Sequence, residues 1–200
     1  MPHEDELRRA WQAGDLTALA RGALGAYGPE IFGLLGALLR DEADAQDAWA
    51  QFAEDLWRGL PRFRYESSVR TWAYAIARHA ATKVRLNRNA GARRQVALSA
   101  SPVSQMAAEI QERTATYLRT QAKSELTELR SALKADDQLL LVLRVDRAMS
   151  WDEIAVVMGE GADDGTLLER RSALLRKRFQ LVKDRLRREA QSKGLLRDDG

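Results

Sequence analysis

Apolar residues in the first 90 positions recur at the spacing of helices, not in the alternation of strands. The clearest run falls at i, i+3, i+4, i+7 and i+8 and consists of Ile31, Leu34, Leu35, Leu38 and Leu39. A second stripe consists of Ala45, Ala48, Trp49, Phe52, Ala53 and Leu56. A third consists of Val69, Trp72, Ala73, Ile76 and Ala80. With an earlier helix expected over about residues 5–24, these stripes predict four helices in a compact antiparallel bundle.

Proline and glycine mark the expected ends of these helices. Pro29 lies close before the first stripe, where proline is typical of a helix start. Gly59 and Pro61 follow the second stripe and are expected to stop it.

The helical pattern is interrupted between about residues 89 and 106, and returns from about Ala107. The interruption contains Asn89, Gly91 and a Ser/Pro cluster at 99–104, which are typical of a linker. A second helical module is expected from about Lys123, and its first apolar face consists of Leu139, Val142 and Leu143.

Within this module, Ser150-Trp151-Asp152-Glu153 has the S-x-x-E spacing of a capping box. The short helix after it places on one face Trp151, Ile154, Ala155 and Met158. A turn rich in glycine is expected from Gly159 to Gly165. A long basic helix over about 166–189 would follow, with its inward face made of Leu168, Leu175, Phe179, Val182 and Leu186. This order is typical of a helix-turn-helix, although any helical hairpin can imitate it.

Signals for β-structure are nearly absent, so we predict an all-α fold with two modules. The N-terminal helical bundle is assigned to residues 1–92 and a flexible linker to 93–122. The helix-turn-helix module is assigned to 123–192 and a short tail to 193–200.

Composition limits the classes of protein that need to be considered. Hydrophobic residues make up 45% of the 200 residues and charged residues 30%, which is ordinary for a soluble domain. The absence of cysteine excludes a disulfide framework and a cysteine-based zinc site. The longest apolar run, Ile31–Leu39, is far shorter than the roughly 20 residues that span a bilayer, and the N-terminus does not resemble a signal peptide. We therefore expect a cytoplasmic protein without membrane insertion.

Charge is distributed unevenly along the chain. Residues 41–55 carry six acidic residues and no basic one, whereas residues 78–94 carry six basic residues and no acidic one. Residues 170–188 carry nine basic residues against Asp184 alone. Helices often carry solvated charge of one sign, but two basic runs together with one acidic run suggest different partners for different faces.

Signs of catalysis are missing. The two histidines, His3 and His79, belong to no metal-binding or acid–base motif, and no P-loop or nucleophile elbow is present. The series Gly22, Gly25 and Gly28 does not match a phosphate-binding pattern. We therefore predict that the protein is not an enzyme and uses neither a cofactor nor a metal.

A more specific pattern begins at Asp44. It consists of Asp44, Asp47, Gln51 and Phe52, then Trp57, Leu60 and Phe63, and then the block Arg70-Thr71-Trp72-x-Tyr74-x-Ile76-Ala77-Arg78. This segment resembles region 2 of extracytoplasmic-function (ECF) sigma factors, the small members of the sigma-70 family. The resemblance covers about residues 27–88, and residues 126–188 resemble region 4 more loosely.

The resemblance implies a sigma factor that carries core RNA polymerase to promoters. Region 2 would grip the polymerase clamp and capture the opened −10 element, and region 4 would reach the flap and read the duplex −35 element. Members of this family are often held by an anti-sigma factor, which is a further candidate partner. The acidic helix would suit a basic coiled coil on the clamp, and the implied polymerase-binding residues are Asp44, Asp47, Gln51 and Phe52. For Phe52, packing in the core is an equal alternative.

For the −10 element, the resemblance implies a pocket in the loop before the Thr-Trp helix and a cationic face along that helix. Cationic and aromatic groups hold unpaired bases, and a pocket must offset the cost of unstacking a base. The implied residues are Arg62, Arg64, Tyr65, Ser68, Arg70, Arg78, His79, Lys83, Arg85 and Arg88. His79 stands where relatives often carry Asn, so the base preference stays open, and it could equally be an ordinary surface histidine. Trp72 and Tyr74 are candidates for the core.

For the −35 element, the N-terminal side chains of the long basic helix would enter the major groove. Arginine can donate two hydrogen bonds to guanine, whereas more distal cations hold phosphate. The implied residues are Thr166, Glu169, Arg170, Arg171, Ser172, Arg176, Lys177 and Arg178. Two departures weaken this match: Leu133-Lys134 replaces a frequent Leu-Pro pair, and the distance from Glu153 to the basic cluster is about five residues longer than usual.

Two other readings remain at this point. A helix-turn-helix regulator would bind duplex DNA without polymerase, and the Thr-Trp block argues against it. An interaction-only helical bundle, such as an adaptor, would bind no DNA, and the long basic helix over about 166–189 argues against it.

Overall fold

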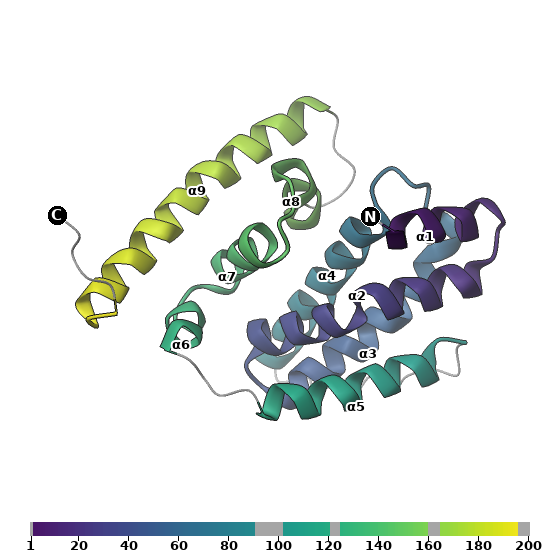
Figure 1. The fold of residues 1–200 in the computed structure, drawn as a ribbon, viewed down its shortest axis with the longest axis horizontal. Helices are drawn as coiled ribbons and strands as arrows, with labels where there is room; N and C mark the ends of the chain where they lie inside the picture. The colour runs from purple at the N-terminus through teal and green to yellow at the C-terminus, as the bar shows by residue number, and fades with distance from the viewer. Residues whose placement is uncertain (1, 91–101, 121–124, 160–164, 196–200) are drawn as a thin grey trace. The chain divides into compact units, whose positions relative to one another are not determined.

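The computed structural model describes residues 2–90, 102–120, 125–159 and 165–195. All regular elements in these ranges are helices, and no strand occurs in them, which confirms the predicted all-α fold (Figure 1). The chain divides into two compact units, residues 1–121 and 122–200.

The first unit is a helical bundle built around its second helix. Its elements are α1 (Pro2–Gln12), α2 (Leu16–Leu39), α3 (Glu42–Gly59), the short η1 (Leu60–Arg62), α4 (Val69–Asn89) and α5 (Ser104–Thr120). Helix α2 packs against α1, α3, α4 and α5, and α3 packs most extensively on α4 (Figure 1). The core of the unit therefore lies between α2, α3 and α4.

The N-terminal boundaries differ from the sequence-based expectation. Instead of one helix over about 5–24, the chain turns at Gly14, whose φ is +69°, and Asp15 caps α2 by accepting a hydrogen bond from the Ala18 amide at 2.8 Å. Pro29 does not start a helix but lies inside α2. Proline within a helix costs about 3 kcal/mol, and the extensive burial of α2 offsets this cost because the helix is covered by four neighbours.

Helix α2 also corrects the expectation that no apolar segment approaches the length of a membrane span. Its 24 residues are long and apolar enough to cross a membrane by length and composition. Half of them are buried inside the bundle, however, among them Leu19, Leu24, Ile31 and Leu35. A helix covered in this way by its neighbours is the core helix of a globular unit.

The predicted apolar stripes form the core, with one shift. Every residue of the first two stripes is buried, including Trp49, whose ring meets Phe32 edge-on at 5.6 Å between centroids. The third stripe is displaced, because α4 contacts both α2 and α3. Tyr74 is buried, whereas Trp72 and Ile76 are partly exposed.

The glycine series of α2 allows close approach of neighbouring helices. A Cβ atom at Gly22 would lie 2.7 Å from the Leu7 side chain of α1. One at Gly28 would lie 3.0 Å from Ile110 of α5 and 3.2 Å from the Trp49 ring. These glycines therefore serve packing.

Helix α5 lies within the range 93–122 that the sequence suggested as a linker. Its residues Ala107 and Ile110 are buried, and the Trp49 indole donates a hydrogen bond to the Ala107 carbonyl at 2.9 Å. The structure therefore places 104–120 in the first unit. The central part of the expected linker, 91–101, and residues 121–122 lie outside the described residues.

The second unit contains α6 (Glu125–Ser131), α7 (Ala135–Leu141), the π-helical turn η2 (Val142–Asp146), α8 (Trp151–Met158) and α9 (Gly165–Ser192). The predicted capping box is present: the Glu153 amide donates to the Ser150 hydroxyl at 3.2 Å, and the Ser150 amide donates to the Glu153 carboxylate at 2.8 Å. Helix α8 packs on α9 (Figure 1). Between them, the Trp151 ring meets Phe179 edge-on. Most of the predicted glycine-rich turn, 160–164, lies outside the described residues.

Candidate nucleic-acid interface

The loop at residues 63–68 joins η1 to α4 and is held in a constrained conformation. Tyr65 has a φ of +59°, which non-glycine residues rarely adopt. Ser68 caps α4 and accepts a hydrogen bond from the Thr71 amide at 3.0 Å. Arg62 and Arg64 are exposed beside it. The loop thus presents two cations next to a fixed aromatic ring.

An aromatic cluster holds the loop against the rest of the unit. Trp11 of α1 lies 5.2 Å from the Tyr65 ring, and its indole donates to the Phe63 carbonyl at 3.1 Å. The Phe63 ring stacks on Trp72 at 4.6 Å between centroids. The guanidinium of Arg8 lies 4.8 Å from the Tyr65 ring centroid, in cation–π geometry. Sequence reasoning missed Trp11 and Arg8, because nothing local links α1 to this loop.

The carboxylate of Glu4 connects α1 to the start of α4. It accepts hydrogen bonds from the backbone amides of Val69 at 3.2 Å and Arg70 at 2.9 Å. It also accepts from the hydroxyls of Tyr27 at 2.8 Å and Tyr65 at 3.2 Å. Burial, followed by this hydrogen bond and the Glu4 charge, raises the pKa of Tyr27. The pKa of Tyr65 is raised by burial, then by the Glu4 charge and hydrogen bond. No local pattern in the sequence links Glu4 to this loop.

Along α4, the predicted DNA-binding side chains differ in their exposure to solvent. His79 is exposed, whereas Arg70, Arg78 and Arg85 are partly buried. Lys83 and Arg88 are exposed but engage α3: the Lys83 ammonium donates to the Gln51 side chain at 3.1 Å, and Arg88 pairs with Asp44 at 2.8 Å.

The predicted polymerase-binding residues lie mostly on the inner side of α3. Phe52 is 1% exposed and its ring lies 5.2 Å from Trp49, so its alternative role as a core residue is the one that the structure supports. Asp44 and Gln51 are also buried, because they face α4 and bind its cations. Asp47 is partly exposed. Of these four side chains, Asp47 is therefore the most accessible to a partner.

In the second unit, the predicted DNA-contacting residues of α9 are divided between surface and interior. The exposed ones are Thr166, Glu169, Arg170, Arg176 and Lys177. Ser172, which was predicted to contact DNA, is buried and donates to the Asp152 carboxylate at 2.6 Å, so its side chain joins α9 to α8. Arg178 pairs with Asp137 of α7 at 2.6 Å. The Arg171 guanidinium packs over Gly159, where an added Cβ would lie 2.6 Å from it.

The exposed side of α9 also carries leucines that sequence reasoning passed over. Leu167, Leu174 and Leu181 recur every seven residues and are 45%, 65% and 69% exposed. Residues seven apart lie on nearly the same face of a helix. A leucine side chain cannot form a hydrogen bond with a base edge. Any hydrogen bond from this face of α9 to a base would have to come from a residue such as Arg170.

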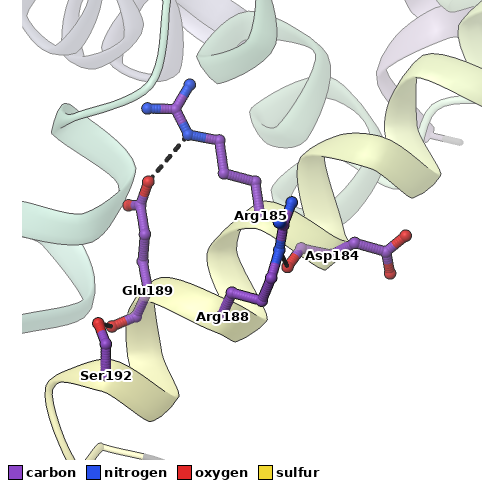
Figure 2. A network of polar contacts seen from close by, with 5 residues as sticks. All are labelled: Asp184, Arg185, Arg188, Glu189 and Ser192. Atoms are coloured by element: carbon purple, nitrogen blue, oxygen red, sulfur yellow. Dashed lines mark hydrogen bonds and ion pairs between the residues drawn. The ribbon is translucent and has the colours of Figure 1, made fainter.

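Near the C-terminus of α9, charged side chains form hydrogen bonds with other residues of the same helix. Arg185 donates to the Glu189 carboxylate at 2.8 Å, and this hydrogen bond raises the pKa of Arg185 (Figure 2). Arg188 donates to the Asp184 carbonyl and Ser192 to the Glu189 carbonyl (Figure 2). Arg185 and Arg188 therefore use hydrogen bonds within α9, whereas Arg170, nearer the N-terminus of the helix, is exposed and makes no such hydrogen bond.

In the part of the chain that the structure describes, no group of three or more His, Asp or Glu side chains could hold a metal ion. The arrangement is instead that of a cationic and aromatic surface, in which the loop at 63–68 and the outer side of α4 can contact an anionic, base-bearing polymer.

Comparison with known proteins identifies part of the first unit. Residues 24–90, from within α2 to the end of α4, match the family model of Sigma-70 region 2. No curated protein and no solved structure matches the chain. The match includes the constrained loop and the cationic helix and leaves out α1, α5 and the second unit. The chain therefore contains a sigma-70 region 2 domain at residues 24–90.

Proposed function

We propose that this protein is a sigma factor of the ECF group, which binds core RNA polymerase and directs it to specific promoters. The observation that carries the proposal is the Sigma-70 region 2 match over the helices that present the loop at 63–68. In this function the protein would work in the cytoplasm and perform no catalysis of its own.

In this function, the first unit captures the melted −10 strand. Arg62 and Arg64 are exposed beside the loop and would hold phosphates, while the fixed ring of Tyr65 and the hydroxyl of Ser68 line the place where an unstacked base would enter. The exposed His79 would lie along the same strand. Fixed aromatic groups suit this task because they recover the stacking that the base loses.

The polymerase contact is assigned to the outer side of α3. Asp47, the most accessible of the four predicted polymerase-binding residues, gives this side a negative charge that would suit a basic segment of the clamp. Asp44 and Gln51 would act indirectly, because they bind Arg88 and Lys83 and so fix α3 against the DNA-facing helix.

The second unit is assigned to the −35 element as region 4. Its support is the capped α8 packed on the basic α9, which is the arrangement of a helix-turn-helix. Arg170 is the best candidate for base contact, because it is exposed near the start of α9, and Arg176 and Lys177 are candidates for phosphate contact.

In vitro transcription tests the proposed function directly. Core RNA polymerase from the same organism is incubated with a library of its genomic DNA, with and without the purified chain. We expect new transcripts with defined start sites only when the chain is present. No new transcript together with tight binding of duplex DNA by the chain alone would favour the regulator instead.

The double substitution Arg70→Ala, His79→Ala is expected to impair promoter opening and to leave polymerase binding intact. Loss of one cation and one ring from the strand-binding face should weaken the opened complex by about 1–3 kcal/mol. Opening is measured by permanganate reactivity of unpaired thymines, and polymerase binding by pull-down. Arg21→Ala, an exposed cation of α2, is the control. Loss of polymerase binding in the double variant would count against the assignment.

Arg170→Ala is expected to weaken binding of a −35 duplex by about 1–3 kcal/mol if the guanidinium is bidentate to guanine. Arg171→Ala should have a smaller effect on DNA binding, because that guanidinium packs over Gly159. Affinity is measured by fluorescence anisotropy at constant salt. Arg187→Ala removes an equal charge about 25 Å along the helix and is the control. Equal losses for Arg170→Ala and Arg187→Ala would show non-specific attraction only.

A further inference from the structure

The first turn of α4 has a local cap in Ser68, but Ser68 satisfies only part of the helix N-terminus. This turn contains no acidic residue, although negative charge there is favourable because the first amides and the helix dipole point toward it. The Ser68 hydroxyl accepts a hydrogen bond from the Thr71 amide. The two amides before it, those of Val69 and Arg70, donate to the Glu4 carboxylate of α1. A residue 65 positions away in sequence thus completes the cap.

The Glu4 carboxylate has little spare accepting capacity. Two oxygens of a carboxylate offer about four acceptor positions. Glu4 uses them for the amides of Val69 and Arg70 and for the hydroxyls of Tyr27 and Tyr65. Glutamine at this position would keep one accepting oxygen and would turn a donating NH₂ group toward the other pair of donors. The substitution Glu4→Gln therefore removes about half of these bonds and the charge, with almost no change of shape.

The same carboxylate holds the loop in its strained form. Tyr65 at φ +59° is stable only if its surroundings compensate for the conformation. Its hydroxyl lies 3.2 Å from the Glu4 carboxylate and 3.2 Å from the Glu4 main-chain carbonyl. Its ring lies 5.2 Å from those of Trp11 and Phe63 between centroids. Three contacts of Tyr65 come from side chains of α1: the hydrogen bond to Glu4, the ring contact with Trp11 and the cation–π contact with Arg8. Strained residues of this kind often occur at functional sites.

We propose that Glu4 is a positioning residue for strand capture: it locks the loop at 63–68 and the start of α4 in the geometry that receives the melted DNA strand. This inference rests on the proposed function, and it extends the strand-binding site to α1, which lies outside the residues 24–90 matched to region 2. Glu4 does not touch the DNA; it acts through Tyr65 and the two amides.

The structural arm of the test uses the full chain without DNA. In Glu4→Gln, amide hydrogen exchange at one of the two residues Val69 and Arg70 is expected to accelerate roughly tenfold or more, because these amides donate to different Glu4 oxygens and glutamine keeps only one accepting oxygen. The matched control is Glu6→Gln, which makes the same chemical change at an exposed position of α1. Unchanged exchange at both amides in Glu4→Gln would overturn the proposal.

The functional arm uses the reconstituted holoenzyme and a labelled single strand that spans the −10 region of a promoter found by the transcription experiment. Glu4→Gln is expected to bind this strand roughly tenfold more weakly, since small misplacement of binding groups is costly. Glu6→Gln should bind it as the unmodified protein does, and duplex −35 binding should be unchanged in both variants.

A second control separates positioning from general stability. Tyr27→Phe removes the shortest hydrogen bond to Glu4 but no bond to the loop. If Glu4 only stabilises the packing of α1 on α2, Tyr27→Phe will weaken strand binding as much as Glu4→Gln does, and the proposal is overturned. If it positions the loop, Tyr27→Phe will bind the strand nearly normally. If the unmodified holoenzyme opens no promoter, the proposed function itself fails, whereas normal strand binding by Glu4→Gln refutes the positioning role alone.

Discussion

Trp49→Ala is expected to lower the free energy of unfolding of the first unit by about 3–5 kcal/mol. Trp49 is completely buried at the centre of the bundle, where its ring contacts Phe32 and Phe52. Truncation removes this apolar surface and leaves a cavity that the surrounding rings can fill only in part. It also removes the indole hydrogen bond to the Ala107 carbonyl, which attaches α5. The loss is measured by urea denaturation followed by circular dichroism.

Two further variants show which part of Trp49 matters. Trp49→Phe keeps an aromatic ring and removes the donor to Ala107, so a loss of about 1–3 kcal/mol is expected for the unpaired buried carbonyl and the smaller ring. Trp57→Ala truncates a partly exposed tryptophan of the same helix and should cost less than Trp49→Ala. Equal losses at positions 49 and 57 would contradict the central place of Trp49 in the core.

The second large effect is a loss of stability at alkaline pH. Tyr27 and Tyr65 have a pKa in the folded protein that is raised above the ordinary value of 10.0. For Tyr27 the causes are burial and the bond to Glu4, which outweigh the opposing charge of Arg70. For Tyr65 burial and Glu4 outweigh Arg8. Each folded-state proton is therefore held more tightly than in the unfolded chain.

The sign of the effect follows from this difference. The stabilisation is fully present below a pH of about 10 and is lost as the pH rises from there through the folded pKa. Over that interval Tyr27 lowers the free energy of unfolding by about 1.4 kcal/mol per pH unit, and Tyr65 contributes a decrease in the same direction. Urea denaturation at a series of pH values above 9 measures the slope, and absorbance of tyrosinate follows the titration.

Tyr27→Phe is the control for this prediction, because phenylalanine keeps the ring and cannot titrate. Its unfolding free energy should fall less steeply with pH than that of the unmodified protein. Glu4→Gln should flatten the dependence as well, since the Glu4 charge contributes to both shifts. Identical slopes in all three proteins would show that these tyrosines titrate normally.

Much of the helical framework could be predicted from sequence because it depends on local rules. The stripes at Ile31–Leu39 and Ala45–Leu56 are buried as their spacing indicates, since a helix with one apolar face must cover it. The capping box at Ser150 formed because its two hydrogen bonds join residues three apart. The Thr-Trp block likewise indicated the segment that matches Sigma-70 region 2.

The candidate site could be predicted only in part. The loop at 63–68 and the exposed Arg62 and Arg64 were indicated by the resemblance to sigma-factor region 2 together with their residue types. The inward orientation of Phe52 was indicated by its place in the second apolar stripe. That of Ser172 was not predicted, because spacing shows that a residue is on a helix but not which neighbour covers that side. Ser172 faces inward, where its hydroxyl donates a hydrogen bond to the Asp152 carboxylate of α8.

The amino-acid sequence by itself determined where most helices form, because periodicity and capping act within a few residues. Only the tertiary structure decided that α2 continues through Pro29, that α5 covers the bundle and that Glu4 caps a helix 65 positions away. These outcomes depend on burial and on hydrogen bonds between segments distant in the chain. Such contacts exist only after the helices have packed, so no local pattern encodes them.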